Sequence, residues 1–92
     1  MMYNIDFTDD AKEDLITLKK SEINAYNKAM RLIEELQEHP RTGTGKPELM
    51  KYGTLKGLWS RRITGKHRLV YSINDNKITV LVLSASSHYN DK

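Results

Sequence analysis

Cysteine is absent from this 92-residue chain, which excludes disulfide bonds and thiol chemistry. No apolar run approaches the roughly 20 residues that a membrane-spanning helix needs, so we expect no membrane partner. The N-terminal segment MMYNIDFTDDAKEDL is acidic and lacks the basic-then-apolar order of a secretory signal. These absences predict a soluble, cytoplasmic protein, and the length predicts a single domain over residues 1–92.

The patterns of several common enzyme sites are also missing. The chain has no phosphate-binding GxxxxGK[ST] motif and no serine in a strand–turn–helix elbow, which argues against nucleotide hydrolysis and acyl transfer. Its histidines, His39, His67 and His88, are far apart, and none has a helical i+4 partner or a nearby pair of carboxylates. We therefore predict no metal site and no cofactor.

The chain does have an uneven distribution of charge. Residues 1–39 carry nine acidic and five basic side chains, a net −4, whereas residues 40–92 carry ten basic and three acidic ones, a net +7. A basic half of this kind indicates a surface that faces a polyanion. The alternative is that the lysines are scattered over a solvated face, and composition alone does not separate the two.

The first half of the chain predicts one strand followed by two helices. Apolar and polar residues alternate over Tyr3–Phe7, which is typical of a half-buried strand. A helix is expected after it, ending near Lys20, and Glu13 lies three residues after Asp10 as in a capping box. The candidate N-cap residues are Thr8, Asp9 and Asp10. The expected buried residues of this helix are Ala11, Leu15 and Leu18.

A second helix is expected to follow. Ser21 is a candidate for its N-cap, and His39-Pro40 is expected to end it. Its expected buried residues are Ile23, Tyr26, Met30, Ile33 and Leu36.

The second half predicts a long loop and three strands. Residues 41–57 are rich in glycine and basic side chains, and loops of this length are often functional. Strands are expected over Leu58–Thr64, His67–Ile73 and Lys77–Ala85, joined by short turns that favour antiparallel pairing. The predicted fold is α+β, in the order β-α-α-β-β-β, with two helices on one face of a four-stranded, mainly antiparallel sheet.

Strand geometry separates the basic side chains by face. Neighbouring residues of a strand point to opposite faces, so Arg61 and Arg62 cannot both line one groove. Arg68 is expected on the exposed face, opposite the helix-facing Leu69 and Tyr71. For Trp59 and Tyr71 we favour places in the core over stacking on bases. His67 is predicted to contact phosphate or to be a plain surface residue, and His39 to lie at a helix end near the last carbonyls.

Several blocks of the sequence resemble a known family. It is similar to the Txe/YoeB toxins of bacterial toxin–antitoxin pairs, within the RelE superfamily. The resemblance rests on these blocks, in this order: Gly45-Lys46-Pro47-Glu48 with Leu49 and Lys51, Leu55 with Gly57, Trp59-Ser60-Arg61-Arg62-Ile63-Thr64, His67-Arg68-Leu69-Val70-Tyr71, and His88-Tyr89.

The resemblance implies a ribosome-dependent endoribonuclease that cleaves mRNA in the ribosomal A site. Cleavage of RNA without metal needs a base for the 2′-OH proton, a cation for the negative phosphorane and an acid for the leaving 5′-oxygen. The residues at the family's matching positions imply these roles for this chain: Glu48 is the base, Arg68 the transition-state clamp, His88 the acid, Lys51 and Arg62 phosphate contacts, and Tyr89 an orienting residue.

The implied partners are the ribosome, mRNA and an antitoxin of the YefM type that wraps the basic cleft through coupled folding. The sequence leaves open whether the chain is a monomer or a homodimer. Two other hypotheses remain: a non-catalytic RNA-binding module, and an interaction protein whose groove holds an acidic peptide. Replacing Glu48 with alanine discriminates the first of these, because a module that only binds RNA loses nothing.

Overall fold

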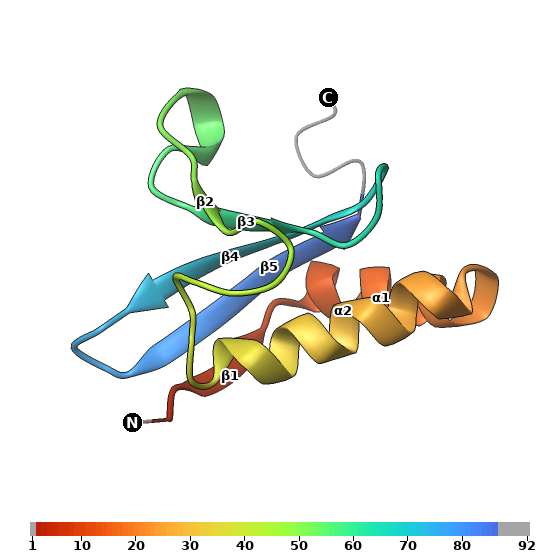
Figure 1. Ribbon diagram of the computed structural model, residues 1–92, viewed down its shortest axis with the longest axis horizontal. Coiled ribbons are helices and arrows are strands. Elements are labelled where there is room, and N and C mark those ends of the chain that lie inside the picture. The colour runs from red at the N-terminus through yellow and green to blue at the C-terminus, as the bar shows by residue number, and fades with distance from the viewer. Residues whose placement is uncertain (1, 87–92) are drawn as a thin grey trace.

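The computed structural model describes residues 2–86, and Figure 1 shows two helices against one face of a sheet. The elements in chain order are β1 (Asn4–Phe7), α1 (Asp9–Ser21), α2 (Ile23–Leu36), β2 (Glu48–Leu49), a 3-10 turn (Gly53–Leu55), β3 (Trp59–Arg62), β4 (Arg68–Asn74) and β5 (Thr79–Ser86). The predicted α+β class is confirmed. No helix in the described residues is long and apolar enough to cross a membrane.

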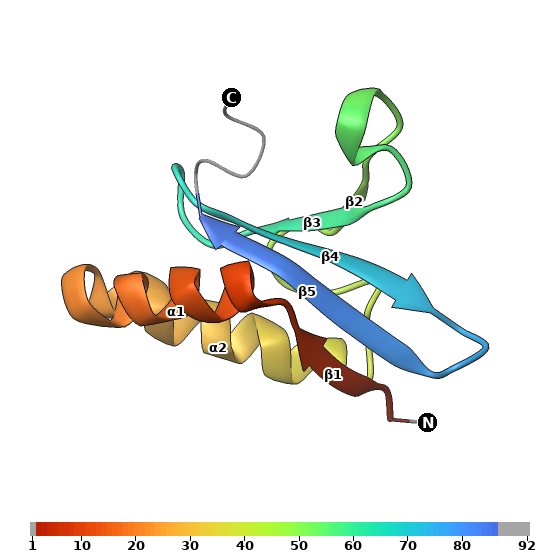
Figure 2. The ribbon, with the colours of Figure 1, turned by 180° about the vertical axis from the view of Figure 1, so that it is seen from behind.

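The sheet has five strands in the order β1-β5-β4-β3-β2, one more than predicted. The added strand, β2, is two residues long, and it pairs Glu48 with Ser60 and Leu49 with Trp59. So short a segment has no alternating pattern to reveal it, because pairing with the edge of β3 is what makes it a strand. At the opposite edge β1 runs parallel to β5 (Figure 2), and the other paired strands are antiparallel.

The helix caps differ in part from the prediction. Thr8 caps α1, since its hydroxyl accepts a hydrogen bond from the Ala11 amide at 3.1 Å. Ser21 does not cap α2: it is the last residue of α1, and its hydroxyl donates to the Thr17 carbonyl at 2.8 Å. A single residue, Glu22, links the two helices, because α1 continues one residue beyond the predicted end at Lys20.

The core lies between the helices and the sheet. The prediction for α2 is confirmed for Ile33 and Leu36, which are buried, and Tyr26 is partly buried against the core, but two other members of the predicted stripe are exposed. Ile23 and Met30 were expected to be buried but are 51% and 38% exposed. The buried residues of α2 are Ala25, Ala29, Leu32, Ile33 and Leu36. Two stripes with helical spacing overlap in this sequence, and the one with alanines lets the helix backbone approach its neighbours closely. The expected burial of Ala11, Leu15 and Leu18 in α1 is confirmed.

The predicted faces of β4 are also correct. Leu69 and Tyr71 are completely buried in the helix-facing core, whereas Arg68 is exposed. Between Val70 and Tyr71 the register with β5 shifts, so that Val70 pairs with Ser84 and Tyr71 with Val82. This bulge changes which residues of β5 face the helices, and Ser84 comes to lie on the same face as Val70.

Candidate active site

On the sheet face away from the helices, side chains form two neighbouring cross-strand rows. Directly opposed residues on antiparallel strands point to the same side of a sheet. In the first row Glu48 pairs with Ser60, Ser60 with Val70, and Val70 with Ser84. Glu48, the predicted base, therefore lies at the outer end of a row of small side chains.

The second row carries positive charge. Arg62 pairs with Arg68, and Arg68 pairs with Ser86. It lies two residues along β3 and β4 from the first row, a spacing of about 7 Å. Glu48, Arg62 and Arg68 are all exposed. The structure thus brings three predicted site residues, from three different strands, to one open face.

The middle of the first row, Ser60, Val70 and Ser84, forms a buried surface beside these charged groups, called the floor below. Ser60, Val70 and Ser84 are only 1%, 3% and 1% exposed, although they face away from the helices. The Ser60 hydroxyl donates to the sulfur of Met50 at 3.6 Å and receives a long hydrogen bond, 3.5 Å, from Nη1 of Arg68. The Arg68 guanidinium therefore leans from β4 across β3, toward the row that ends in Glu48.

The role of this floor was missed in the sequence. Ser60 stands two positions before Arg62 and so shares its face of β3, a signal that strand alternation alone provides. Ser84 lies next to the bulge of β5, where simple alternation fails, and its hydroxyl is buried without a hydrogen-bond partner among the described residues.

The remaining predicted residues lie beyond the sheet. Lys51 is exposed on the connection between β2 and the 3-10 turn, and Lys56, also exposed, directly follows that turn. The segment between β2 and β3 that contains the turn projects from the sheet in Figure 1. His88 and Tyr89 lie outside the described residues, so their roles stay predictions.

Comparisons with known proteins match this arrangement to one family. A family model described as a YoeB-like toxin of bacterial type II toxin–antitoxin systems matches residues 7–89. The chain belongs to the YoeB-like toxins. It is 41% identical over 88 residues to toxin RelK of Mycobacterium tuberculosis, covering 96% of this chain and all of that protein.

Solved structures agree with the family assignment. A YoeB–YefM complex from Staphylococcus aureus contains a chain that is 31% identical, with a TM-score of 0.80 over 97% of this toxin and all of that chain. A YoeB dimer from the same organism is 33% identical with a TM-score of 0.79, again over 97% and 100% of the two chains. This YoeB-like toxin therefore has the fold of proteins solved both with an antitoxin and as a dimer.

Within the toxin, Arg61 and Arg62 point to opposite faces of β3, as the sequence predicted. Arg61 is completely buried on the helix side, whereas Arg62 is exposed. Trp59 is partly buried against the core and Tyr71 is completely buried, so the core assignment that we preferred for both is confirmed.

His67 occupies a place that neither sequence hypothesis predicted. It is only 7% exposed, and its Nε2 lies 2.9 Å from Oε2 of Glu22, which also lies 3.7 Å from Nζ of Lys66. The hydrogen bond with His67 lowers the pKa of the Glu22 carboxyl below its usual value. A turn accounts for this placement of His67. The Thr64 hydroxyl accepts hydrogen bonds from the amides of Lys66 and His67, and the turn directs the imidazole toward Glu22 between the two helices.

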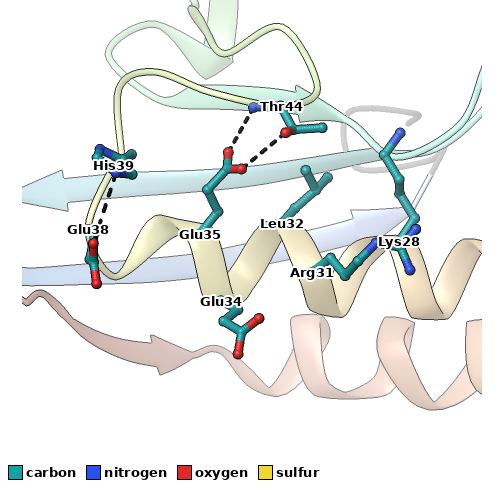
Figure 3. Close-up of a pocket in the computed structure, with 8 residues that line it drawn as sticks. All are labelled: Lys28, Arg31, Leu32, Glu34, Glu35, Glu38, His39 and Thr44. Atoms are coloured by element: carbon teal, nitrogen blue, oxygen red, sulfur yellow. Dashed lines mark hydrogen bonds and ion pairs between the residues drawn. The ribbon is translucent and has the colours of Figure 1, made fainter.

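A pocket of about 520 Å³ lies on the helix side of the toxin, between α2 and the loop that follows it (Figure 3). It contains none of the predicted site residues. Its lining residues are Lys28, Arg31, Leu32, Glu34, Glu35, Glu38, His39 and Thr44. The hollow is thus separate from the open face with Glu48 and Arg68. Within residues 2–86, no three His, Cys, Asp or Glu side chains gather closely enough to hold a metal ion.

Proposed function

We propose that this toxin is a ribosome-dependent endoribonuclease that cleaves mRNA in the ribosomal A site by acid–base chemistry. The observation that carries the proposal is the joint placement of Glu48, Arg62 and Arg68 on one exposed sheet face. A carboxylate that shares a face with two guanidinium groups can serve attack by a 2′-OH on a phosphate, since the face then offers both a base and positive charge for the transition state.

In the proposed reaction Glu48 takes the proton of the 2′-OH, and the resulting oxygen attacks the adjacent phosphorus. Arg68 meets the negative charge that develops on the phosphorane, and its guanidinium presents two parallel donors for that purpose. His88 gives a proton to the leaving 5′-oxygen. The reaction breaks the phosphorus–5′-oxygen bond and needs no metal ion. Arg62 and Lys51 bind neighbouring phosphates, and Tyr89 orients the substrate.

The partners follow from the same surface. An exposed cationic face is attracted to rRNA and mRNA, whose phosphates dominate nonspecific affinity. An antitoxin of the YefM type would silence the toxin by covering this face, as a segment that folds on binding. The solved YoeB–YefM complex and the solved YoeB dimer support a YefM-type partner and self-association as proposals for this chain.

The test is primer extension on translated mRNA, with and without ribosomes. We expect cleavage only with ribosomes, and a loss of about 10²–10⁴-fold in Glu48→Gln and in His88→Ala if each supplies general base or acid catalysis. Glu34→Gln, at an exposed position of α2, is the matched control and should cleave like wild type. RNA binding without cleavage in the wild type, unchanged by Glu48→Gln, would instead indicate a non-catalytic RNA-binding module.

A further inference from the structure

A buried guanidinium organises the loop that leads to Glu48. The side chain of Arg61 is completely buried, in the space between β3, the end of α2 and residues 39–44. Its nitrogens donate to the carboxylate of Glu35, to the backbone carbonyls of His39, Thr42 (2.7 Å) and Thr44 (3.2 Å), and to Oη of Tyr71 (3.1 Å). One side chain therefore holds three carbonyls of the segment that leaves α2.

Glu35 completes the attachment from α2. Its Oε1 accepts the amide of Thr44 at 2.7 Å, and its Oε2 accepts the Thr44 hydroxyl at 3.0 Å, as Figure 3 shows. Burial works to raise the pKa of this carboxyl, but the hydrogen bonds from Thr44 and Arg61 outweigh burial, so the pKa lies below its usual value. The amide, hydroxyl and carbonyl of Thr44 are all bound by Glu35 and Arg61.

The chain between Thr44 and Glu48 has little freedom. The Gly45 carbonyl accepts the Arg62 amide at 2.7 Å, and a Cβ added to Gly45 would lie 3.0 Å from the Arg62 carbonyl oxygen. Gly45 also has φ +86°, a conformation that side chains disfavour. Three residues later Glu48 pairs with Ser60 on β2. The loop thus crosses the edge of β3 in close contact and delivers Glu48 to the open face.

We infer that Arg61 and Glu35 are positioning residues for Glu48, holding from the helix side of the sheet the loop that carries this carboxylate on the other side. The inference rests on the proposed function. The Arg61–Glu35 ion pair, in which Arg61 is completely buried and the Glu35 side chain is 28% exposed, contributes little to stability, because desolvation offsets much of its attraction. It is well suited to fixing a loop, and misplacing a catalytic group by about 1 Å is enough to cost on the order of 10²-fold in rate.

The test is a double-mutant cycle between Glu35 and Glu48, in which the measured quantity is the rate of single-turnover cleavage on ribosomes that carry mRNA. We expect Glu35→Ala to slow cleavage by about tenfold or more, while ribosome affinity changes by less than about threefold. Added to Glu48→Gln, it should slow the residual cleavage by less than about twofold, because a group that acts through Glu48 has nothing left to position. Effects that multiply would overturn the inference.

Rescue by a conservative variant provides an independent readout. The glutamine of Glu35→Gln can accept from Arg61 and the Thr44 amide with its oxygen and donate to the Thr44 hydroxyl with its nitrogen. It should therefore restore cleavage to within about threefold of wild type. The matched control is Glu34→Ala, whose side chain points away from Thr44 (Figure 3) and whose loss should leave cleavage unchanged.

Folding is kept separate from positioning in two ways. Thermal melts of every variant show the folded fraction at the assay temperature, and Thr44→Val provides a second variant if Glu35→Ala does not fold. Thr44 is exposed, so its valine variant should fold, and it should lose cleavage by about threefold with the same lack of further effect in Glu48→Gln. If Glu48→Gln itself cleaves like wild type, both the proposed function and the inference fail. If Glu48→Gln slows cleavage strongly and Glu35→Ala slows the residual cleavage of that variant as much as it slows wild type, only the inference fails.

Discussion

The substitution Tyr71→Phe removes a single oxygen atom from the core. We expect it to destabilise this toxin far more than the loss of one atom would suggest. Tyr71 is completely buried, and its hydroxyl donates to the Pro40 carbonyl at 2.8 Å while accepting from Nε of Arg61 at 3.1 Å. Burial raises the pKa of the phenol, so the group stays neutral and keeps its donor role at ordinary pH. The variant leaves a carbonyl and a charged donor without their partner.

Each buried group left without a partner costs about 1–3 kcal/mol, and partial relaxation of the loop offsets some of this. We therefore expect the free energy of unfolding to fall by about 2–3 kcal/mol. For a domain of this length each kcal/mol corresponds to roughly 4–8 °C, so Tm should fall by about 10–20 °C.

Urea unfolding provides the assay, with fluorescence from Trp59, the single tryptophan, which packs against the core. The matched control is Tyr52→Phe, because Tyr52 is 86% exposed and its change should stay within about 0.5 kcal/mol of wild type. A Tyr71→Phe variant as stable as Tyr52→Phe would refute the reasoning, since Arg61 and the Pro40 carbonyl would then have found other partners at no cost.

The other predictions concern charge. Arg68→Lys should leave ribosome affinity within about threefold but slow single-turnover cleavage by about tenfold or more, because lysine lacks the planar pair of donors; equal losses in both would make Arg68 a binding residue. Affinity for ribosomes should fall steeply with salt, and Lys51→Ala or Arg62→Ala should each reduce the slope by roughly one unit for every phosphate contact made; a flat dependence contradicts the electrostatic account. The lowered pKa of Glu35 contributes stability that is present above its unfolded value of 4.5 and lost as the pH falls through the folded value. Below pH 4.5 the urea midpoint of wild type should therefore fall more steeply than that of Glu35→Gln, and parallel curves would contradict this.

The sequence by itself determined the features that depend on short-range geometry. Alternation along a strand separates Arg61 from Arg62 and places Arg68 opposite Leu69, because successive side chains of a strand must point to opposite faces. Apart from β2, the order of helices and strands followed from local periodicity and breaking residues in the same way. The family was recognised from the blocks around Glu48, Arg62 and Arg68, since side-chain chemistry and spacing are present in the sequence itself.

Only the tertiary structure decided which of several locally equivalent arrangements is used. α2 offers two stripes of helical spacing, and packing selects the one with Ala25 and Ala29 over the one with Met30. β2 forms because its two residues pair with the edge of β3. His67 turns inward because its imidazole contacts the Glu22 carboxylate there. The network around Arg61 joins residues from α2, the loop and β4 that are up to 26 positions away. These outcomes depend on contacts between distant segments, whose geometry no local pattern contains.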